Sequence, residues 1–194
     1  MENKPIHICE EYKPANKLKD KVALITGGDS GIALHYIKEG AKVAFTYHQR
    51  EKEDADKTLK ELQSICESSD NAIAVEVELK GDKECEKFVD TAYNNFGSID
   101  ILVNNAAVQF PKKDFTINDG IRVNAVAPGP VWTPLIPSSF DKEKVEDFGE
   151  GDLLGAPAQP ADIASAYVFL VNEIESKYFI GQVLHPNGGE IVNG

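Results

Sequence analysis

Apolar runs and amphipathic stretches alternate along most of this 194-residue chain. Short, nearly continuous apolar runs such as KVALIT and AKVAFTY are typical of strands that are buried on both faces of a parallel sheet. The stretches between them place apolar residues three and four positions apart, which is the spacing of one helix face. The pattern therefore predicts an α/β fold in which helices cover both faces of a parallel sheet. The expected strands are residues 21–26, 41–47, 71–79, 99–107, 121–129 and 181–189, and the expected helices are residues 31–40, 52–67, 82–96 and 160–172.

Each predicted helix has a face that we expect to turn toward the sheet. The third helix ends at a glycine, Gly97, a common residue just after a helix. The inward residues are expected to be Ile32 and Tyr36 in the first helix, Ala55, Leu59, Leu62 and Cys66 in the second, and Cys85, Phe88, Val89 and Ala92 in the third.

Chain length favours one domain with a substantial core. Residues 1–16 are polar and read as an N-terminal arm that packs loosely, which leaves residues 17–194 as a single domain. No apolar run reaches membrane-spanning length, and the first 20 residues lack the apolar segment of a signal peptide. We therefore expect a cytoplasmic protein.

The charge and the cysteines exclude several functions. The formal net charge is −12, so the surface repels phosphate backbones and anionic lipids, and we expect no nucleic-acid or membrane partner. Cys9, Cys66 and Cys85 are odd in number and widely spaced. We interpret them as reduced thiols that form neither a disulfide framework nor a metal site.

Three glycines follow the first predicted strand: Gly27, Gly28 and Gly31. Glycine lets the backbone turn sharply and approach a pyrophosphate, and the helix N-terminus beyond it offers free N–H groups. An ordinary strand-to-helix turn is the alternative, but the place of this turn in a strand–helix series favours a phosphate site. Ala33 stands where a third glycine is usual.

Four segments, in order, resemble the motifs of the short-chain dehydrogenase/reductase family. They are TGGDSGI at 26–32, NNAA at 104–107, IRVNAVAPGPVWTP at 121–134 and GQVLHPNGG at 181–189. Within the family the chain is most similar to the glucose and ribitol dehydrogenase homologs. The resemblance implies a Rossmann-type, doubly wound parallel sheet. It also implies an NAD(P)-dependent oxidoreductase that acts on a sugar, a polyol or another small carbonyl or alcohol.

The resemblance also implies which residues line the cofactor. It assigns the phosphates and a ribose to the glycine turn, the adenine to an acidic–aliphatic pair, the adenosine ribose to the NNAA motif and the nicotinamide to the proline–glycine turn. The residues of the glycine turn are Gly27, Asp29, Ser30, Gly31 and Ile32, and the acidic–aliphatic pair is Glu78 and Leu79. The residues of the NNAA motif are Asn104, Ala106 and Ala107, and those of the proline–glycine turn are Pro128, Gly129, Val131 and Thr133.

The end of the second strand bears on the choice between NAD and NADP. An acid at this place often binds the ribose 2′-hydroxyl of NAD, but here no acid occurs before Glu51. Arg50 is suited to a 2′-phosphate, which favours NADP, with NAD as the alternative. A solvated surface arginine is the other interpretation of Arg50.

The catalytic residues of the family are missing from the expected place. The resemblance implies a tyrosine with a lysine four residues later and a serine, all between the motifs at 104–107 and 121–134. Residues 108–120 are too few for the two helices and the strand that carry these groups, so we assign no catalytic residue. No tyrosine of this chain has a lysine four residues later; the tyrosines are Tyr12, Tyr36, Tyr47, Tyr93, Tyr167 and Tyr178.

The chain therefore looks internally truncated. The segment 108–120 is short for a parallel crossover, so we expect either a strained connection or an exposed apolar strand edge. The first helix is also about one turn short of the length that the strands need. The resemblance implies a homo-oligomer, whose main contact would be lost with the missing helices.

Three functions stay open. The first is an active oxidoreductase, the second a non-catalytic protein that binds nucleotide or other proteins, and the third a truncated product that misfolds. Because the catalytic residues are missing, we expect the chain to be inactive or impaired, with cofactor binding itself open to impairment.

Four further residues were weighed. We expect His35 to be at the surface or half-buried and Ser138 and Ser139 to be turn residues. Trp132 is either part of a substrate lid or an anchor for its own loop.

Overall fold

A computed structural model describes residues 5–8, 11–27, 30–66, 68–106, 121–151 and 153–190. The chain divides into two compact units. One is the contiguous stretch 13–112, and the other combines residues 1–12 with residues 113–194. The single domain expected for residues 17–194 stays a prediction.

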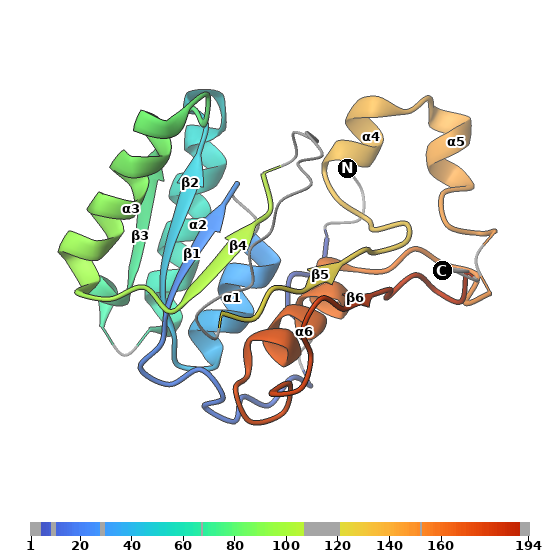
Figure 1. Ribbon diagram of the computed structural model, residues 1–194. Coiled ribbons are helices and arrows are strands. Elements are labelled where there is room, and N and C mark those ends of the chain that lie inside the picture. Colours follow the sequence, from blue (N-terminus) through green and yellow to red (C-terminus); the bar gives the residue numbers. More distant parts are fainter. Residues whose placement is uncertain are drawn as a thin grey trace. The chain divides into compact units, whose positions relative to one another are not determined.

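Residues 13–112 form a four-stranded parallel sheet in the order β3-β2-β1-β4 (Figure 1). Strand β1 (Val22–Thr26) lies between β2 (Lys42–Tyr47) and β4 (Ile101–Asn104). Strand β3 (Ala72–Glu76) pairs with β2 on its outer side. This order, which steps outward from β1 and then returns to its other side, is the first half of a doubly wound fold. The predicted Rossmann-type α/β class is confirmed.

Three helices connect these strands: α1 (Ser30–Lys38), α2 (Lys52–Ile65) and α3 (Asp82–Phe96). Right-handed crossovers place α1 and α2 on one face of the sheet and α3 on the other, as Figure 1 shows. Two short 3₁₀ turns, Gln49–Glu51 and Ser69–Asn71, lie before α2 and β3. The helix predicted at residues 82–96 is confirmed over its whole length.

Fewer residues of α3 face the core than expected. Phe88 and Ala92 are buried against Val22 and Leu24 of β1. Val89 is 42% exposed and Cys85 is also exposed, so the inward orientation predicted for these two residues is wrong. Phe88 and Ala92 lie on one line of the helix, whereas Val89 is turned about 100° from Phe88 and Cys85 about 60° to the other side.

The segment before β1 is anchored rather than loose from Ala15 onward. The carboxylate of Glu39, which directly follows α1, accepts hydrogen bonds from the backbone N–H groups of Ala15 (3.1 Å) and Lys17 (2.8 Å). The N–H of Leu18 donates to the Glu39 carbonyl oxygen at 3.0 Å, and the Leu18 side chain is buried. We call residues 15–18 the N-terminal strap.

In the other unit, β5 (Ala125–Val126) and β6 (Val183–Leu184) form a separate parallel pair. The strands predicted at 121–129 and 181–189 are thus much shorter than expected. Prolines explain this, because Pro128 and Pro186 lack the N–H that would continue the ladder.

The described part of this unit also contains the helices α4 (Leu135–Ser139), α5 (Lys142–Glu146) and α6 (Pro160–Val171). Ser138 and Ser139 are the last residues of α4, so their assignment to a turn is wrong. The N-terminus of α6 has Pro160 at its first position and a capping box between Gln159 and Asp162.

The C-terminus of α6 is capped by Arg122, which lies in the segment just before β5. Arg122 donates through Nη1 to the carbonyl oxygens of Leu170 (2.8 Å) and Ser176 (3.1 Å). Leu170 lies in the last turn of α6, where backbone carbonyls have no partner in the helix ladder, and Ser176 lies beyond the helix. The positive guanidinium is favourable at the negative end of the helix dipole. The cap therefore joins the segment before β5 to the end of α6.

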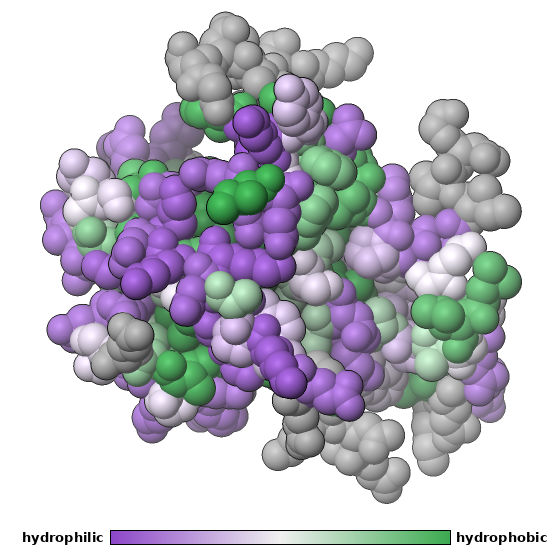
Figure 2. Space-filling view, turned by 90° about the horizontal axis from the view of Figure 1, so that it is seen from below, coloured by the Kyte–Doolittle hydropathy of each residue, from purple (hydrophilic) through white to green (hydrophobic). Residues whose placement is uncertain are grey.

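Strand β4 has an apolar edge. Among the described residues it is hydrogen-bonded as a strand to β1 alone, and Leu102 is 59% exposed. The segment 108–120 lies outside the described residues, so the choice between a strained connection and an exposed edge stays a prediction. Elsewhere the surface seen in Figure 2 is mainly hydrophilic, with hydrophobic residues in separate areas.

No helix in the part of the chain that the structure describes is both long and apolar enough to cross a bilayer.

Candidate functional site

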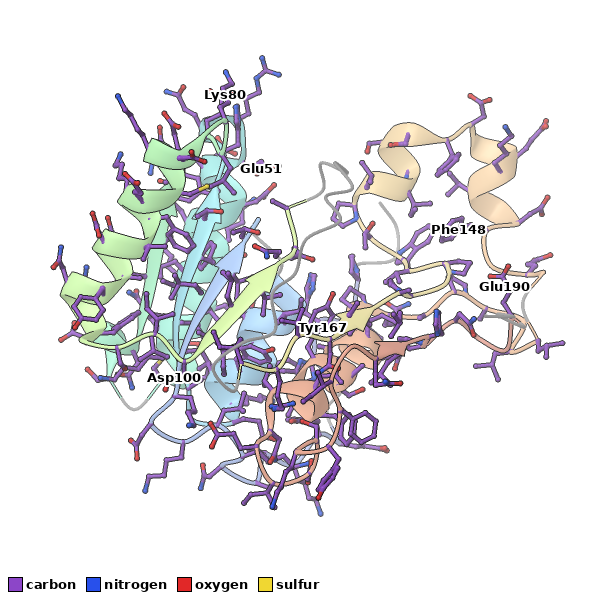
Figure 3. The ribbon with its side chains drawn as sticks, in the orientation of Figure 1. Glu51, Lys80, Asp100, Phe148, Tyr167 and Glu190 are labelled. Atoms are coloured by element: carbon purple, nitrogen blue, oxygen red, sulfur yellow. The ribbon has the colours of Figure 1, made fainter. Side chains whose placement is uncertain are left out.

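The four parallel strands of residues 13–112 end at one edge of their sheet. Ligands of doubly wound folds bind at this carboxyl edge, where the strand order reverses beside β1. Figure 3 shows Glu51 and Lys80 at this end of the sheet and Asp100 at the opposite end. The predicted site residues of this unit can therefore be followed along the edge from β4 to β3.

The turn after β1 requires glycine at its first position. Gly27 has a φ of +76°, and a Cβ there would lie 3.2 Å from the Cα of Ala106 and 3.3 Å from its nitrogen. The N–H of Gly27 donates to Oγ1 of Thr46 at 3.0 Å. The chain can thus leave β1 in close contact with the segment after β4, as a pyrophosphate-binding turn does.

The hydroxyl of Thr26 fixes the segment that follows β4. It accepts hydrogen bonds from the N–H groups of Asn105 (3.1 Å) and Ala106 (3.2 Å). The structure therefore brings Ala106 to Gly27, as the resemblance implied. Neither Thr26 nor Thr46 was predicted as a site residue. Hydroxyl side chains at two strand ends, beside loops with unpaired N–H groups, are the signal that could have identified them.

Helix α1 begins at Ser30 and contains the predicted site residues Gly31 and Ile32, both buried. The N–H groups of its first turn have no acceptor within the helix, and the helix dipole is positive at this end. An anionic phosphate fits such an end. Two predicted site residues, Asp29 and Ala107, lie outside the described residues, as does the side chain of Ser30.

His35 is buried, with 1% of its surface exposed, so the prediction of a surface or half-buried residue is wrong. Its Nδ1 lies 2.9 Å from the carbonyl oxygen of Gly31. Residues 31–37 of α1 are all buried, so no half-exposed position is left for His35 on this helix.

The end of β2 forms a capped turn that presents Arg50. His48 is the N-cap, and its Nδ1 accepts the N–H of Arg50 at 3.1 Å. The Glu51 carboxylate accepts the N–H of His48 at 3.3 Å, which completes a capping box. The backbone N–H of Arg50 is thus held by His48 within a turn that Glu51 also fixes, while the Arg50 side chain is exposed.

The end of β3 carries the predicted pair Glu78 and Leu79. The Glu78 carboxylate lies 2.8 Å from Lys80 Nζ and 3.5 Å from His48 Nε2. The hydrogen bond and positive charge of Lys80 lower the pKa of Glu78, with a smaller contribution from His48. Leu79 packs against the core under α3. The Glu78 carboxylate is thus paired with the Lys80 ammonium and lies beside the His48 ring.

These features fit a dinucleotide. A diphosphate would lie beside Gly27, the N-terminus of α1 and Ala106, at the carboxyl edge of the sheet. The adenosine ribose would then lie toward Arg50 and the His48–Glu78–Lys80 group. Gly27, Gly31, Ile32, Ala106 and Asn104 would hold the diphosphate and ribose, and Arg50, Glu78 and Leu79 would face the adenosine end.

The other unit contains the predicted proline–glycine turn. A Cβ at Gly129 would lie 2.8 Å from the Cα of Asn187, and the Gly129 N–H donates to the Pro186 carbonyl at 3.2 Å. Asn187 accepts the N–H of Gly189 through Oδ1 (3.1 Å) and donates through Nδ2 to the Glu190 carbonyl (2.8 Å). An aspartate could not make the second bond, which accounts for asparagine here.

The loop beyond Gly129 is fixed mainly through its backbone. Val131 forms a bridge with Ala158, and the Thr133 carbonyl accepts the N–H of Ile136 at 3.1 Å. The ring of Trp132 lies 6.3 Å from that of Phe148. This favours Trp132 as an anchor for its loop. Pro128 is exposed, and the assignment of Pro128, Gly129, Val131 and Thr133 to a nicotinamide stays a prediction.

Known proteins resemble the chain over both units. Residues 21–119 match the family model described as short chain dehydrogenase. Residues 116–190 match the model described as enoyl-(acyl carrier protein) reductase.

Two relatives and one solved structure match nearly the whole chain. A glucose and ribitol dehydrogenase of Daucus carota is 41% identical over 272 residues, with 100% of this chain and 93% of the relative covered. The chloroplastic NADPH-dependent aldehyde reductase 1 of Arabidopsis thaliana is 37% identical, with 100% and 94% covered. The apo-form glucose dehydrogenase of Caenorhabditis elegans has a TM-score of 0.71 at 25% identity, covering 89% of this chain and 98% of that structure.

Proposed function

Because the chain belongs to the short-chain dehydrogenase family, a family of oxidoreductases, we propose that it binds a nicotinamide dinucleotide at the carboxyl edge of the β3-β2-β1-β4 sheet. The observation that carries this proposal is the turn at Gly27, which has a positive φ and where a Cβ would lie only 3.2 Å from the backbone of Ala106. A turn kept so close to the segment after β4 serves the approach of a diphosphate to the backbone. An ordinary loop has no such need.

NADP is the proposed cofactor in preference to NAD. The exposed Arg50, on a turn capped by His48, is suited to hydrogen-bond a 2′-phosphate. Glu78, the acid at the neighbouring strand end, is partnered by Lys80 and His48, so its charge is balanced. The name of the Arabidopsis relative, an NADPH-dependent reductase, supports the same choice.

Hydride transfer by this chain is proposed to be absent or weak. Hydride donation or acceptance is the chemistry that a bound nicotinamide supplies, and the protein must supply an acid or base to the reacting oxygen. The family uses a tyrosine with a lysine four residues later, and this chain has no such pair. Tyr36 and Tyr47 are buried in the core, and Tyr93 and Tyr178 are exposed on the surface. The carrot relative aligns over 272 residues against the 194 of this chain, which supports long internal gaps.

Active turnover of a sugar, a polyol or a small aldehyde is the second candidate. It is favoured by the names of the relatives, a glucose and ribitol dehydrogenase and an aldehyde reductase, which match from end to end. Under either candidate we propose a cytoplasmic protein. We also propose a homo-oligomer that lacks the subunit contact which the missing helices make in the family.

A titration of NADPH fluorescence, a thermal melt and a turnover assay with glucose, ribitol and small aldehydes separate the candidates. Saturable binding without turnover is the expected result. Turnover well above the enzyme-free blank would favour the second candidate. A cooperative melt without saturable binding would reject the proposed cofactor site, and the absence of a cooperative melt would indicate a product that misfolds.

A further inference from the structure

Residues 5–8, the first that the structure describes, contact the N-terminus of α6 through their backbone. The N–H of Ile6 donates to Oε1 of Gln159 at 3.0 Å, and the carbonyl oxygen of Ile6 accepts the N–H of Ala161 at 3.1 Å. The Ile6 side chain is 52% exposed, so its backbone bonds rather than its burial hold Ile6 in place. We call residues 5–8 the Ile6 segment.

The same part of the chain closes a long loop. Val131 pairs with Ala158 in an isolated parallel bridge. The N–H of Trp132 donates to the Ala158 carbonyl at 2.8 Å, and the N–H of Ala158 donates to the Pro130 carbonyl at 2.9 Å. Residues 132–157 leave and return through this pair, which we call the stem, and we call residues 132–157 the aromatic loop.

Side chains of the aromatic loop pack on one another. The ring centroids of Trp132 and Phe140 each lie 6.3 Å from that of Phe148. Gly149 lies so close to Pro157 that a Cβ at Gly149 would be 2.5 Å from the proline nitrogen. A loop that is packed by its own side chains can move as one body, and its motion then depends on how firmly its stem is closed.

The stem is a weak closure by itself. Each of its two hydrogen bonds contributes little net free energy, whereas closing so long a loop costs conformational entropy. The Ile6 segment binds the chain directly beyond the stem, because Gln159 is the residue after Ala158 and Ala161 lies in the first turn of α6.

We propose that the Ile6 segment is a clamp on the aromatic loop. By its bonds to Gln159 and Ala161 it keeps Ala158 in the stem, and its release lets the loop open as one body. Because an exposed segment makes these bonds with its backbone, proteolysis or displacement of residues 5–8 would release the loop. The clamp is independent of the proposed cofactor site, since every contact involved lies in the unit of residues 1–12 and 113–194.

A proline at position 6 tests the clamp. Ile6→Pro removes the N–H that binds Gln159, whereas Ile6→Ala, the matched control, keeps both backbone bonds. We expect the amides of Trp132 and Ala158 to exchange hydrogen about fivefold faster in Ile6→Pro, as the loss of one hydrogen bond predicts, and to stay within about twofold of the native rates in Ile6→Ala. Amides of α2, in the other unit, should exchange equally in all three chains.

Fluorescence gives a second readout, because Trp132 is the only tryptophan in the sequence. Acrylamide should quench Trp132 about twofold more strongly in Ile6→Pro than in Ile6→Ala. Equal stem exchange and equal quenching in these two variants would overturn the inference, because the stem would then stay closed without the clamp. Faster exchange throughout Ile6→Pro, including α2, would also overturn it, since a general loss of stability would explain the result.

The native chain provides a test that does not depend on the folding of a variant. If the loop opens only after the clamp is released, the stem amides of Trp132 and Ala158 exchange no faster than the clamp amides of Ile6 and Ala161. Stem amides that exchange about tenfold faster than the clamp amides would show that the loop opens while clamped and would reject the inference. All these measurements are made without NADPH, so a failure of the clamp and a failure of the cofactor site are distinguishable.

Discussion

Val22 and Asp100 are joined by two hydrogen bonds at the start of β1. The Asp100 carboxylate accepts the N–H of Val22 at 2.9 Å, and the N–H of Asp100 donates to the Val22 carbonyl, also at 2.9 Å. The side chain thus supplies the acceptor that the first residue of β1 would otherwise lack. It also sets the register of β4 against β1, which brings Thr26 opposite Asn104 at the other end of the pair.

Asp100→Ala should lower the free energy of unfolding by about 1–2 kcal/mol, because the Val22 N–H loses a charged acceptor. Asp100→Asn keeps an acceptor oxygen and should cost less. Urea denaturation measures both, with Asp90→Ala on the exposed side of α3 as the control. Equal losses in all three variants would show that the Asp100 bond contributes nothing.

Gly27→Ala should lower the free energy of unfolding by about 2–3 kcal/mol, since the new Cβ adds a tight contact with the Ala106 backbone to an unfavourable φ. The variant should also lose NADPH affinity. Gly97→Ala is a matched control, because Gly97 has a φ of +81° but a Cβ there meets nothing within 4 Å. It should cost about 1 kcal/mol and leave binding unchanged. Denaturant unfolding and NADPH titration measure both variants. Equal losses of stability and equal NADPH affinities in the two variants would contradict the close approach of Gly27 to Ala106.

Glu39→Ala should release the N-terminal strap, because two backbone N–H groups lose their acceptor. We expect faster tryptic cleavage after Lys13, Lys17 and Lys19 and a loss of about 2–3 kcal/mol in the free energy of unfolding. Glu39→Gln keeps one acceptor oxygen and should be intermediate. Glu61→Ala, on the exposed face of α2, should change neither quantity. Cleavage at the native rate in Glu39→Ala would exclude the anchoring role.

Arg50→Ser should raise the NADPH dissociation constant about 10- to 100-fold and change that of NADH by less than about threefold, because only NADPH carries the 2′-phosphate. Lys57→Ser removes an exposed cation on α2 and should affect neither cofactor. Fluorescence titrations with both cofactors measure the ratio. A parallel loss of NADPH and NADH affinity would place Arg50 outside the 2′ position.

The two described cysteines should differ in reactivity. Burial raises the pKa of the Cys66 thiol, and Cys85 is exposed. The thiolate is the reactive form, so at pH 8 iodoacetamide should modify Cys66 about tenfold more slowly than Cys85. A rise in pH should increase both rates, with the Cys66 profile displaced to higher pH. Peptide mapping follows each thiol, and denaturant should make the rates converge. Similar rates in the folded protein would contradict the burial of Cys66.

The elements whose pattern is regular were predictable from the sequence, and those decided by distant contacts were not. The helix at 82–96 carries apolar residues at helical spacing and ends at Gly97, so its bounds were predicted correctly. The strand expected at 121–129 is reduced to Ala125–Val126, because strand length depends on a partner, β6, that is itself ended by Pro186. Hydrophobicity within 121–129 carries no information about that partner.

The candidate site was likewise predictable only in part. Gly27 and Ala106 were predicted through motifs, and the structure brings them together. The residues that support these loops were missed. Thr26 and Thr46 hydrogen-bond to backbone groups far away in sequence, and His48 bonds to the backbone of its own turn. His35 was misplaced because an imidazole usually favours a half-exposed position, and its partner, the Gly31 carbonyl, is a backbone group that no side-chain pattern reveals.

The division of the chain into units sets an order for folding during synthesis. Residues 13–112 are contiguous and can fold as soon as they leave the ribosome. The other unit joins the two ends of the chain: the N–H of Ile6 donates to Gln159 at 3.0 Å, and the N–H of Ala161 donates to the Ile6 carbonyl at 3.1 Å. Ile6 is therefore synthesised early but can form these hydrogen bonds only after Gln159 and Ala161 have been made. A nascent chain halted once residues 13–112 have all left the ribosome should already resist protease over the sheet and remain sensitive before residue 13.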